Sequence, residues 1–208
     1  LWRDSDQPGG PVFNWVEIGA TGTPITTLNG DDQSAGPISL GFDFPFYGQS
    51  FNSVRVTTNG FLSFTDTATD LSNDPLPNTG APANLLAVFW DDLHFRSQNR
   101  ARYLADGNRF IVQYSNVDRF TSTTPSDLTF QVILYPNGRI VYQYLTMTSA
   151  ELASATVGIQ NATKIDGLTA VYNAAYVHNN MAVEVGPPFV WPRVQPSSGS
   201  VPAGGFID

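Results

Sequence analysis

The sequence predicts an all-β protein, an antiparallel β-sandwich of roughly ten to twelve strands. Three observations lead to this fold class. Short apolar or aromatic segments recur along the 208 residues, and each borders on a Gly, Pro or Asn-Gly turn. The 18 glycines and 15 prolines are spread along the chain, which suits many short strands joined by tight turns. No long segment has apolar residues at the i, i+3, i+4 and i+7 spacing of an amphipathic helix.

The early strands stand out from their surroundings. Residues 1–37 look irregular apart from one short strand, because Gly, Thr and Asp dominate them. Asn59-Gly60 is expected to be a tight position, where glycine adopts a conformation that other residues resist.

From residue 85 an unbroken apolar run predicts a fully buried central strand. The predicted strands, in chain order, span residues 13–18, 38–44, 54–64, 85–95, 102–104, 109–117, 128–135, 139–144, 155–160, 169–172 and 182–185.

Two β-hairpins are predicted in the second half of the chain. The first turns at Ala105-Asp106-Gly107-Asn108 and the second at Pro136-Asn137-Gly138. The strand before the second turn alternates clearly, so its side chains divide between two faces. One face receives Phe130, Val132 and Leu134, and the other receives Gln131, Ile133 and Tyr135.

The composition changes near the end of the chain. Residues 1–186 are predicted to form the sandwich, and residues 187–208 a Pro/Gly/Ser linker that resembles the opening of an immunoglobulin-like module. Within that linker, Trp191 is expected to pack between domains. The chain begins at Leu1 with no visible signal peptide, which indicates a processed or excised piece of a longer protein.

The charge balance narrows the classes of partner. The net charge is −8 and nine of the ten basic residues are scattered arginines, so no basic face for nucleic acid or anionic membranes is expected. No apolar run approaches the ~20 residues that cross a bilayer, so no membrane insertion is expected. The chain has no cysteine, which removes disulfides, thiolate metal sites and cysteine nucleophiles.

Catalytic motifs are missing from the sequence. The two histidines, His94 and His178, lie far apart, and no nucleophile elbow or phosphate-binding loop is present. A serine triad or a two-histidine zinc site would need these histidines to converge with a carboxylate. The prediction is therefore a protein without catalytic residues.

Pairs of adjacent carboxylates are the best candidates for metal binding. Asp91 and Asp92 come first because they end a buried strand, where charges need a partner. Asp31 and Asp32 come second, and Asp4 with Asp6 forms a further pair. Carboxylate and loop carbonyl oxygens are the ligands that Ca²⁺ prefers, so Ca²⁺ is the expected cofactor if there is one. Two alternatives stay open: solvated turn residues, or the paired acids of a glycosidase.

Residues 65–84 form the longest polar loop, and long loops are often functional. A glycan could hydrogen-bond to its side chains and stack on aromatic residues exposed nearby. The alternative is a solvated crossover between two sheets. The expected ligand-binding residues are Asp66, Asp70, Asn73 and Asp74 of the loop, with Tyr47 and Phe51 as the stacking aromatics.

Five phrases occur in a fixed order between residues 38 and 160. They are Phe44-Pro45-Phe46-Tyr47-Gly48, the stretch 56–64 with Asn59-Gly60, Val88-Phe89-Trp90-Asp91-Asp92, the hairpin 130–138 that starts with Phe130-Gln131, and Val157-Gly158-Ile159. This order resembles the nidogen-like extracellular domain. The resemblance implies a role in extracellular matrix or adhesion, and it offers no shared catalytic residues.

The expected function is therefore a non-catalytic module of a larger secreted or cell-surface protein. It would mediate adhesion, bind a glycan or an extracellular protein, or space the neighbouring modules of the same polypeptide. The alternative is an ancillary domain of a secreted hydrolase whose catalytic site lies elsewhere in the polypeptide.

Overall fold

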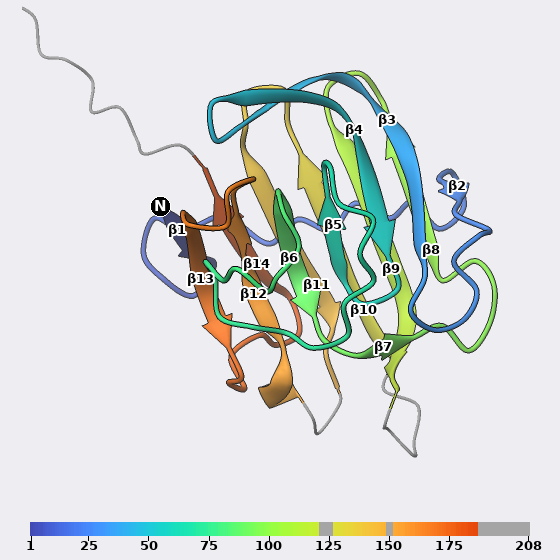
Figure 1. The fold of residues 1–208 in the computed structure, drawn as a ribbon. Helices are drawn as coiled ribbons and strands as arrows, with labels where there is room; N and C mark the ends of the chain where they lie inside the picture. The colour runs from blue at the N-terminus through green and yellow to red at the C-terminus, as the bar shows by residue number, and fades with distance from the viewer. Residues whose placement is uncertain (121–126, 149–151, 187–208) are drawn as a thin grey trace, which may run out of the picture.

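Two antiparallel sheets face each other in the computed structural model, which describes residues 1–120, 127–148 and 152–186 (Figure 1). The predicted sandwich is confirmed. The described residues form fourteen strands, more than the ten to twelve expected, because very short strands such as β2 and β7 also pair. The predicted linker 187–208 and its Trp191 lie outside the described residues.

The first sheet has eight strands. Neighbouring strands pair in the order β1 (Trp2–Asp4), β14 (Met181–Val185), β11 (Ile140–Thr146), β10 (Leu128–Leu134), β9 (Phe110–Arg119), β8 (Ala101–Ala105) and β2 (Thr23–Pro24), with β7 (Leu93–His94) pairing β9 off this path. Both predicted hairpins are confirmed here. They are β8–β9, and β10–β11 with Gly138 at a φ of 85°.

The second sheet has six strands. They pair in the order β13 (Gly167–Tyr172), β12 (Thr156–Gln160), β6 (Leu85–Trp90), β5 (Phe61–Ser63), β4 (Gln49–Thr57) and β3 (Ser34–Phe46). Every residue of β6 is buried, which confirms the predicted central strand. That strand is shorter than the predicted 85–95, because the chain turns at Asp91-Asp92 before β7 begins.

Buried side chains from both sheets fill the space between them. Phe130, Val132 and Leu134 of β10 belong to this core, as their alternation predicts. Three fully buried tyrosines of the first sheet also donate hydrogen bonds to backbone carbonyls of the second. Tyr114 Oη reaches Thr57, Tyr142 Oη reaches Gly158 and Tyr144 Oη reaches Val88, at 3.0, 3.0 and 2.7 Å. These bonds satisfy hydroxyls that water cannot reach and fix how the two sheets lie on each other.

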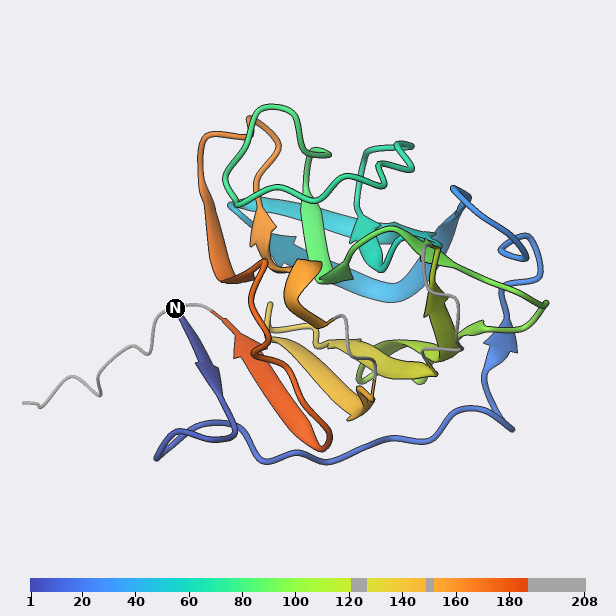
Figure 2. The ribbon, with the colours of Figure 1, turned by 90° about the horizontal axis from the view of Figure 1, so that it is seen from below.

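The predicted strand at residues 13–18 is wrong. Residues 5–22 run as an irregular strap along the outer face of the first sheet, seen in blue in Figure 2. Hydrogen bonds from glutamine side chains, instead of backbone strand pairing, attach the strap to the sheet. Gln143 of β11 accepts from Asn14 N–H and donates to Asn14 C=O, at 2.6 and 2.8 Å, and Gln113 of β9 accepts from Ile18 N–H at 3.1 Å.

The predicted strand 54–64 is a hairpin. Gly60, at a φ of 71°, turns the chain back between β4 and β5. The positive φ favours glycine at this position. Tight packing also requires glycine, because a Cβ on Gly60 would lie 2.1 Å from the carbonyl oxygen of Phe89. The expectation that Asn59-Gly60 is a tight position is confirmed.

The loop of residues 65–84 is irregular, as predicted, but it does not cross between the sheets. It joins β5 to β6, neighbours in the same sheet, and covers the outer face of that sheet (Figure 2). A separate cluster of buried residues lies under the loop, including Phe61, Leu76 and Trp90. Trp90 Nε1 donates to the Asp70 carbonyl at 2.8 Å, so the sheet and the loop are bonded directly.

Candidate functional site

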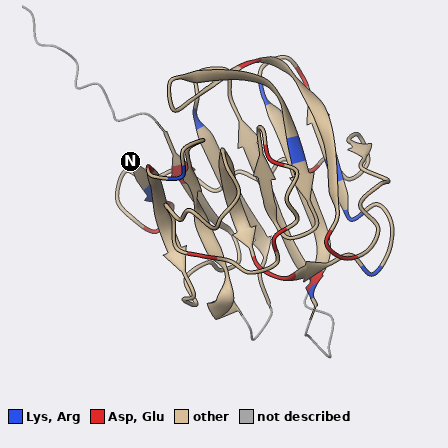
Figure 3. Ribbon diagram, in the orientation of Figure 1, with Lys and Arg blue, Asp and Glu red and all other residues tan. Residues whose placement is uncertain are grey.

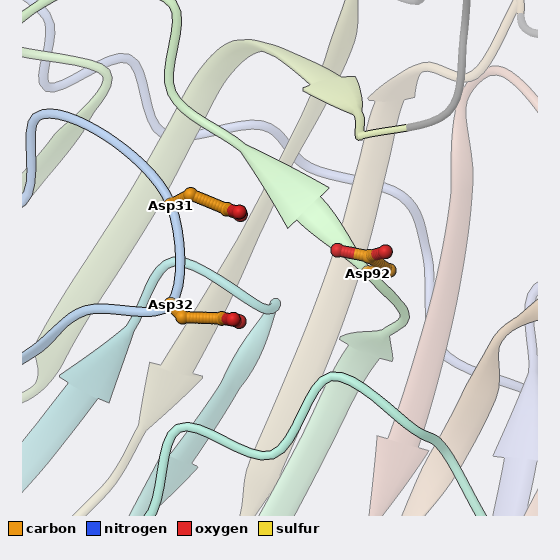
Figure 4. A group of neighbouring side chains, drawn as sticks. All are labelled: Asp31, Asp32 and Asp92. Carbon is orange, nitrogen blue, oxygen red and sulfur yellow. The ribbon is translucent and has the colours of Figure 1, made fainter.

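Three carboxylates converge at the β7 end of the sandwich. Asp31 and Asp32 lie in the turn before β3, and Asp92 lies between β6 and β7; all three side chains point toward one another (Figure 4). One carboxylate oxygen from each lies within 4.8 Å of the others. The structure therefore unites the predicted pair Asp31-Asp32 with one member of the predicted pair Asp91-Asp92.

Asn59 holds these segments together from the β4–β5 turn. Its buried side chain donates to Asp32 Oδ1 at 2.7 Å and to the carbonyl of Thr69 at 3.0 Å. Its amide oxygen accepts from Leu93 N–H at 3.0 Å, and its carbonyl accepts from Asp91 N–H. One buried amide thus links the Asp32 turn, the 65–84 loop and the β6–β7 turn.

Asp91 takes a different role from its neighbour Asp92. Its carboxylate is buried and accepts from Arg119 Nε and from Ser154 Oγ, each at 2.7 Å. Arg119 Nη2 adds a second contact at 3.2 Å, so the pair is bidentate. Asp91 anchors β9 and the short helix η1 (Leu152–Ser154) to the end of β6, whereas Asp92 faces the acidic cluster.

Burial, and then mutual repulsion, raise the pKa of two of the clustered carboxyls. Burial and then the charge of Asp32 raise the pKa of Asp31. Burial and then the charges of Asp31, Asp32 and Asp91 raise the pKa of Asp92. Asp31 Oδ1 is also buried with no hydrogen-bond partner in the part of the chain that the structure describes. Figure 3 shows further acidic residues at this end of the sandwich.

This donor set suits a hard divalent cation. The three side chains offer only oxygen ligands, and Asp32 is exposed, so an ion could enter from solvent. Ca²⁺ takes about six to eight oxygen ligands, which leaves positions for water or for a partner's oxygens. A bound cation would also relieve the repulsion that adds to burial in raising the two pKa values.

The loop residues expected to bind a ligand mostly bond within the molecule. Asp66 accepts from Ala68 N–H and Ala83 N–H, each at 3.0 Å, and these bonds lower its pKa against the opposing effect of burial. Asp70 Oδ1 accepts from Ser72 N–H. Asn73 Nδ2 donates to Thr156 Oγ1 and to Asn173 Oδ1.

The side chain of Asp74 lies near the loop's own Gly80, and the Asp74 carbonyl accepts from Thr156 Oγ1.

The two predicted stacking aromatics lie away from the acidic cluster. Tyr47 is partly exposed at the β3–β4 turn, at the opposite end of the sandwich, and Phe46 packs edge-on against it. Phe51 of β4 is half-buried and stacks on Phe64 at a ring distance of 4.8 Å. The structure does not bring Tyr47 or Phe51 to the carboxylates of the cluster.

The two histidines are engaged in separate contacts. His94 of β7 packs edge-on against Phe120, and the exposed His178 lies 2.8 Å from Asp6. Asp4, the partner of Asp6 in the third predicted pair, is fully buried and accepts from Gln7 and Tyr176. None of the helices in the described residues is long and apolar enough to cross a membrane.

Sequence reasoning missed the role of Asn59. The Asn-Gly pair indicated a turn, and the glycine does make one. Nothing in the sequence marks its second role, because Asn59 and Asp91-Asp92 belong to separate phrases and meet only in the fold, through the Asn59 contacts to Asp91 and Leu93.

Comparison with known proteins identifies the family. No solved structure matches the chain significantly. The sequence pattern of the family described as NIDO related matches residues 11–199, which includes both loops of the acidic cluster and the Asn59-Gly60 turn. The chain therefore belongs to the NIDO-related, that is nidogen-related, family.

Proposed function

We propose that this chain is a calcium-binding, non-catalytic module of a larger secreted or cell-surface protein, and that it binds an extracellular glycan or protein. Family membership supports the general class, because NIDO-type domains are extracellular modules without a shared catalytic apparatus. The ligand and the metal are the proposed parts.

The observation that carries the metal proposal is the convergence of Asp31, Asp32 and Asp92 within 4.8 Å. Like charges at this distance repel each other, and Asp31 Oδ1 is buried with no hydrogen-bond partner among the described residues. A buried charge without a partner is costly, so the arrangement favours an ion that the cluster would hold.

Calcium would act here as a crosslink between two segments. Asp31 and Asp32 lie more than fifty residues before Asp92 in the chain, and the three meet only at the end of the sandwich. An ion bound to all three would fix the turn before β3 against the β6–β7 turn. Because binding loops work best on a rigid scaffold, this would order one end of the module for a ligand.

Titration of calcium and magnesium, followed by calorimetry and by thermal unfolding, tests the metal site. Millimolar Ca²⁺ should raise the melting temperature of the wild type, because it binds the native state alone. Asp92→Asn and Asp31→Asn should lose most of this gain. Asp43→Asn, which removes an exposed carboxylate from β3, is the matched control and should keep it. No heat and no thermal shift with calcium would reject the metal site.

A glycan and matrix-protein array tests the binding role. The wild type should bind at least one probe more strongly in calcium than in EDTA, and Asp92→Asn should behave like the wild type in EDTA. Binding that is equal in calcium and EDTA would separate the ligand site from the acidic cluster. If nothing on the array is bound, the module serves as a spacer or as an ancillary domain of a hydrolase.

A further inference from the structure

An apolar cavity of about 540 Å³ lies between the two sheets, at the end of the sandwich that carries the β3–β4 turn. This end is opposite the acidic cluster and β7 (Figure 1). The volume falls within the ~300–1,000 Å³ of ordinary ligand cavities, so the cavity can hold a small organic molecule. Aliphatic and aromatic side chains from both sheets form its walls, and they include Phe46, Ile140, Ile159, Leu168 and Val185.

The cavity has one charged side chain at its mouth. Asp166, exposed in the turn between β12 and β13, is the only charged side chain among the described residues that line the cavity. Its carboxylate makes no hydrogen bond or ion pair with the part of the chain that the structure describes. Two basic side chains nearby have other partners: Lys164 Nζ donates to the Thr79 carbonyl at 3.4 Å, and Arg139 Nε donates to Glu184 at 2.7 Å. The Asp166 carboxylate is therefore available to a ligand.

Tyr47 lies at the same mouth in a strained conformation. It forms the β3–β4 turn together with Gly48, and both residues have positive φ, at 47° and 75°. Glycine adopts such a conformation readily, but a bulky side chain disfavours it. The Tyr47 ring packs edge-on against Phe46 at a ring distance of 4.8 Å, and its hydroxyl has no hydrogen-bond partner among the described residues. Strained residues of this kind cluster at ligand sites.

The groups at the mouth all favour a positive charge. Burial, and then the charge of Asp166, raise the pKa of Tyr47 to about 12, so the phenol stays protonated beside the carboxylate. A cation at the mouth would be attracted by the Asp166 charge, by the phenol oxygen and by the face of the aromatic ring. An anion in the same place would be repelled by Asp166.

We propose that this cavity binds a small organic cation, with an apolar body between the sheets and an ammonium group held by Asp166 and Tyr47. The ammonium group supplies only donors, which suit a carboxylate and a phenol oxygen as acceptors. Removing the apolar body from water supplies the rest of the binding free energy. Tyr47, which the sequence suggested as a stacking aromatic, would thus contact a ligand at a second site, independent of the proposed calcium site.

Three probes that share an eight-carbon chain test this charge preference. Calorimetric titration of the full chain at pH 7 compares n-octylammonium, 1-octanol and octanoate, all in EDTA so that the proposed metal plays no part. Octylammonium should bind most tightly and octanoate most weakly, with roughly a tenfold difference in affinity, because an attraction to Asp166 replaces a repulsion. Equal affinity for octylammonium and octanoate would overturn the proposal, and so would the absence of binding by all three probes.

Two surface variants test whether Asp166 is the source of the preference. Asp166→Asn should lower the affinity for octylammonium to about that for octanol, and it should leave octanol binding unchanged. Asp43→Asn is the matched control, because it removes an exposed carboxylate of β3 that does not line this cavity, and it should change none of the three affinities. Equal losses of octylammonium binding in the two variants would trace it to the net charge of −8, which also overturns the proposal.

Two further variants test whether the ligand lies in the cavity. Tyr47→Asn keeps a residue that tolerates positive φ but removes the ring, so it should weaken the binding of both octylammonium and octanol. Leu168→Trp fills part of the cavity and should weaken both in the same way. Unchanged binding of octylammonium by folded Tyr47→Asn or folded Leu168→Trp would place the amine elsewhere and overturn the proposal.

Discussion

Arg119 donates from Nε to Oδ2 of Asp91 over 2.7 Å, and this ion pair lies directly beside three carboxylates that repel one another. The side chains of Asp91 and Asp92 are adjacent in sequence but serve opposite purposes. Asp91 is neutralised by a cation, which leaves Asp92 as the carboxylate that faces Asp31 and Asp32. The arginine thus separates a structural anchor from a candidate metal ligand.

Removing the cation from this pair should be costly. The side chains of Arg119 and Asp91 are only 15% and 5% exposed. Arg119→Met leaves a buried carboxylate without its cation, and breaking a buried ion pair in this way typically lowers the free energy of unfolding by about 3–5 kcal/mol. Arg139→Met is the matched control, because the Arg139 side chain is 39% exposed in its pair with Glu184 and should contribute about 0–1 kcal/mol. Urea unfolding of both variants decides, and similar losses would contradict this account.

The acidic cluster should make stability depend on pH in a defined direction. The folded-state pKa values of Asp31 and Asp92 are raised above the ordinary value of 3.8. Their stabilising contribution is therefore present below 3.8 and is lost as the pH rises through the raised folded-state values. Without calcium, both ionised carboxylates lower the free energy of unfolding at pH 7.

Neutralising either group should consequently stabilise the calcium-free protein. Asp31→Asn and Asp92→Asn should each raise the melting temperature at pH 7 by a few degrees, since ~1 kcal/mol corresponds to ~2–4 °C in a domain of this size. The gain should shrink toward pH 4, and it should reverse in calcium, because the proposed calcium site would stabilise the wild type more than either variant. Thermal scans across pH, with Asp43→Asn as the control, measure this. If Asp31→Asn or Asp92→Asn lost stability in calcium-free buffer, the ionised carboxylates of the cluster would not destabilise the folded state at pH 7.

The sequence patterns predict strands well where one face is buried. The alternation in β10 and the apolar run of β6 follow directly from burial, so both were predictable. Residues 13–18 show a similar apolar pattern, yet they form no strand. Their partners are the side chains of Gln113 and Gln143, which stand in the middle of a sheet face, and no local pattern reports that contact.

The candidate site was only partly predictable for a related reason. Asp-Asp pairs are visible in the sequence, and their carboxylates indicate oxygen ligands for a metal ion. Which pairs meet depends on the fold, because Asp31 and Asp92 are distant in sequence. The different roles of Asp91 and Asp92 depend on where Arg119 lies at the end of β9, which also requires the pairing of β7 with β9.

The glutamine row under the strap leads to a third prediction. Gln131 lies in register between Gln113 and Gln143, and both polar atoms of its buried amide have no partner among the described residues. Replacing an unsatisfied buried amide with an apolar group of similar shape should be neutral or stabilising. Gln143→Met instead leaves two backbone groups of Asn14 unpaired and should lose about 1–3 kcal/mol.

Urea unfolding of Gln131→Met and Gln143→Met compares substitutions of the same kind on neighbouring strands. The expected order is Gln131→Met at or above the wild type and Gln143→Met clearly below it. Equal losses would mean that the Gln131 amide also makes a hydrogen bond, for example to a buried water.

Gly60 should be the least replaceable of the turn glycines. Both Gly60 and Gly107 have positive φ, at 71° and 83°, so alanine at either position meets the same backbone strain of about 1–2 kcal/mol. Their surroundings differ, because a Cβ at Gly107 would meet nothing within 4 Å, whereas a Cβ at Gly60 would lie 2.1 Å from the Phe89 carbonyl oxygen.

Gly60→Ala must therefore push β6 away from the turn that holds Asn59. Overpacking of this kind adds ~1–3 kcal/mol or more to the backbone strain, so Gly60→Ala should lose well over twice as much stability as Gly107→Ala. Because Asn59 also positions Asp32 and the β6–β7 turn, Gly60→Ala should weaken the proposed calcium binding, and Gly107→Ala should leave it unchanged. Urea unfolding and calcium calorimetry on the two variants measure both effects. Equal stability losses would show that β6 can shift at little energetic cost. Unchanged calcium binding in folded Gly60→Ala would show that the acidic cluster does not depend on the Asn59-Gly60 turn.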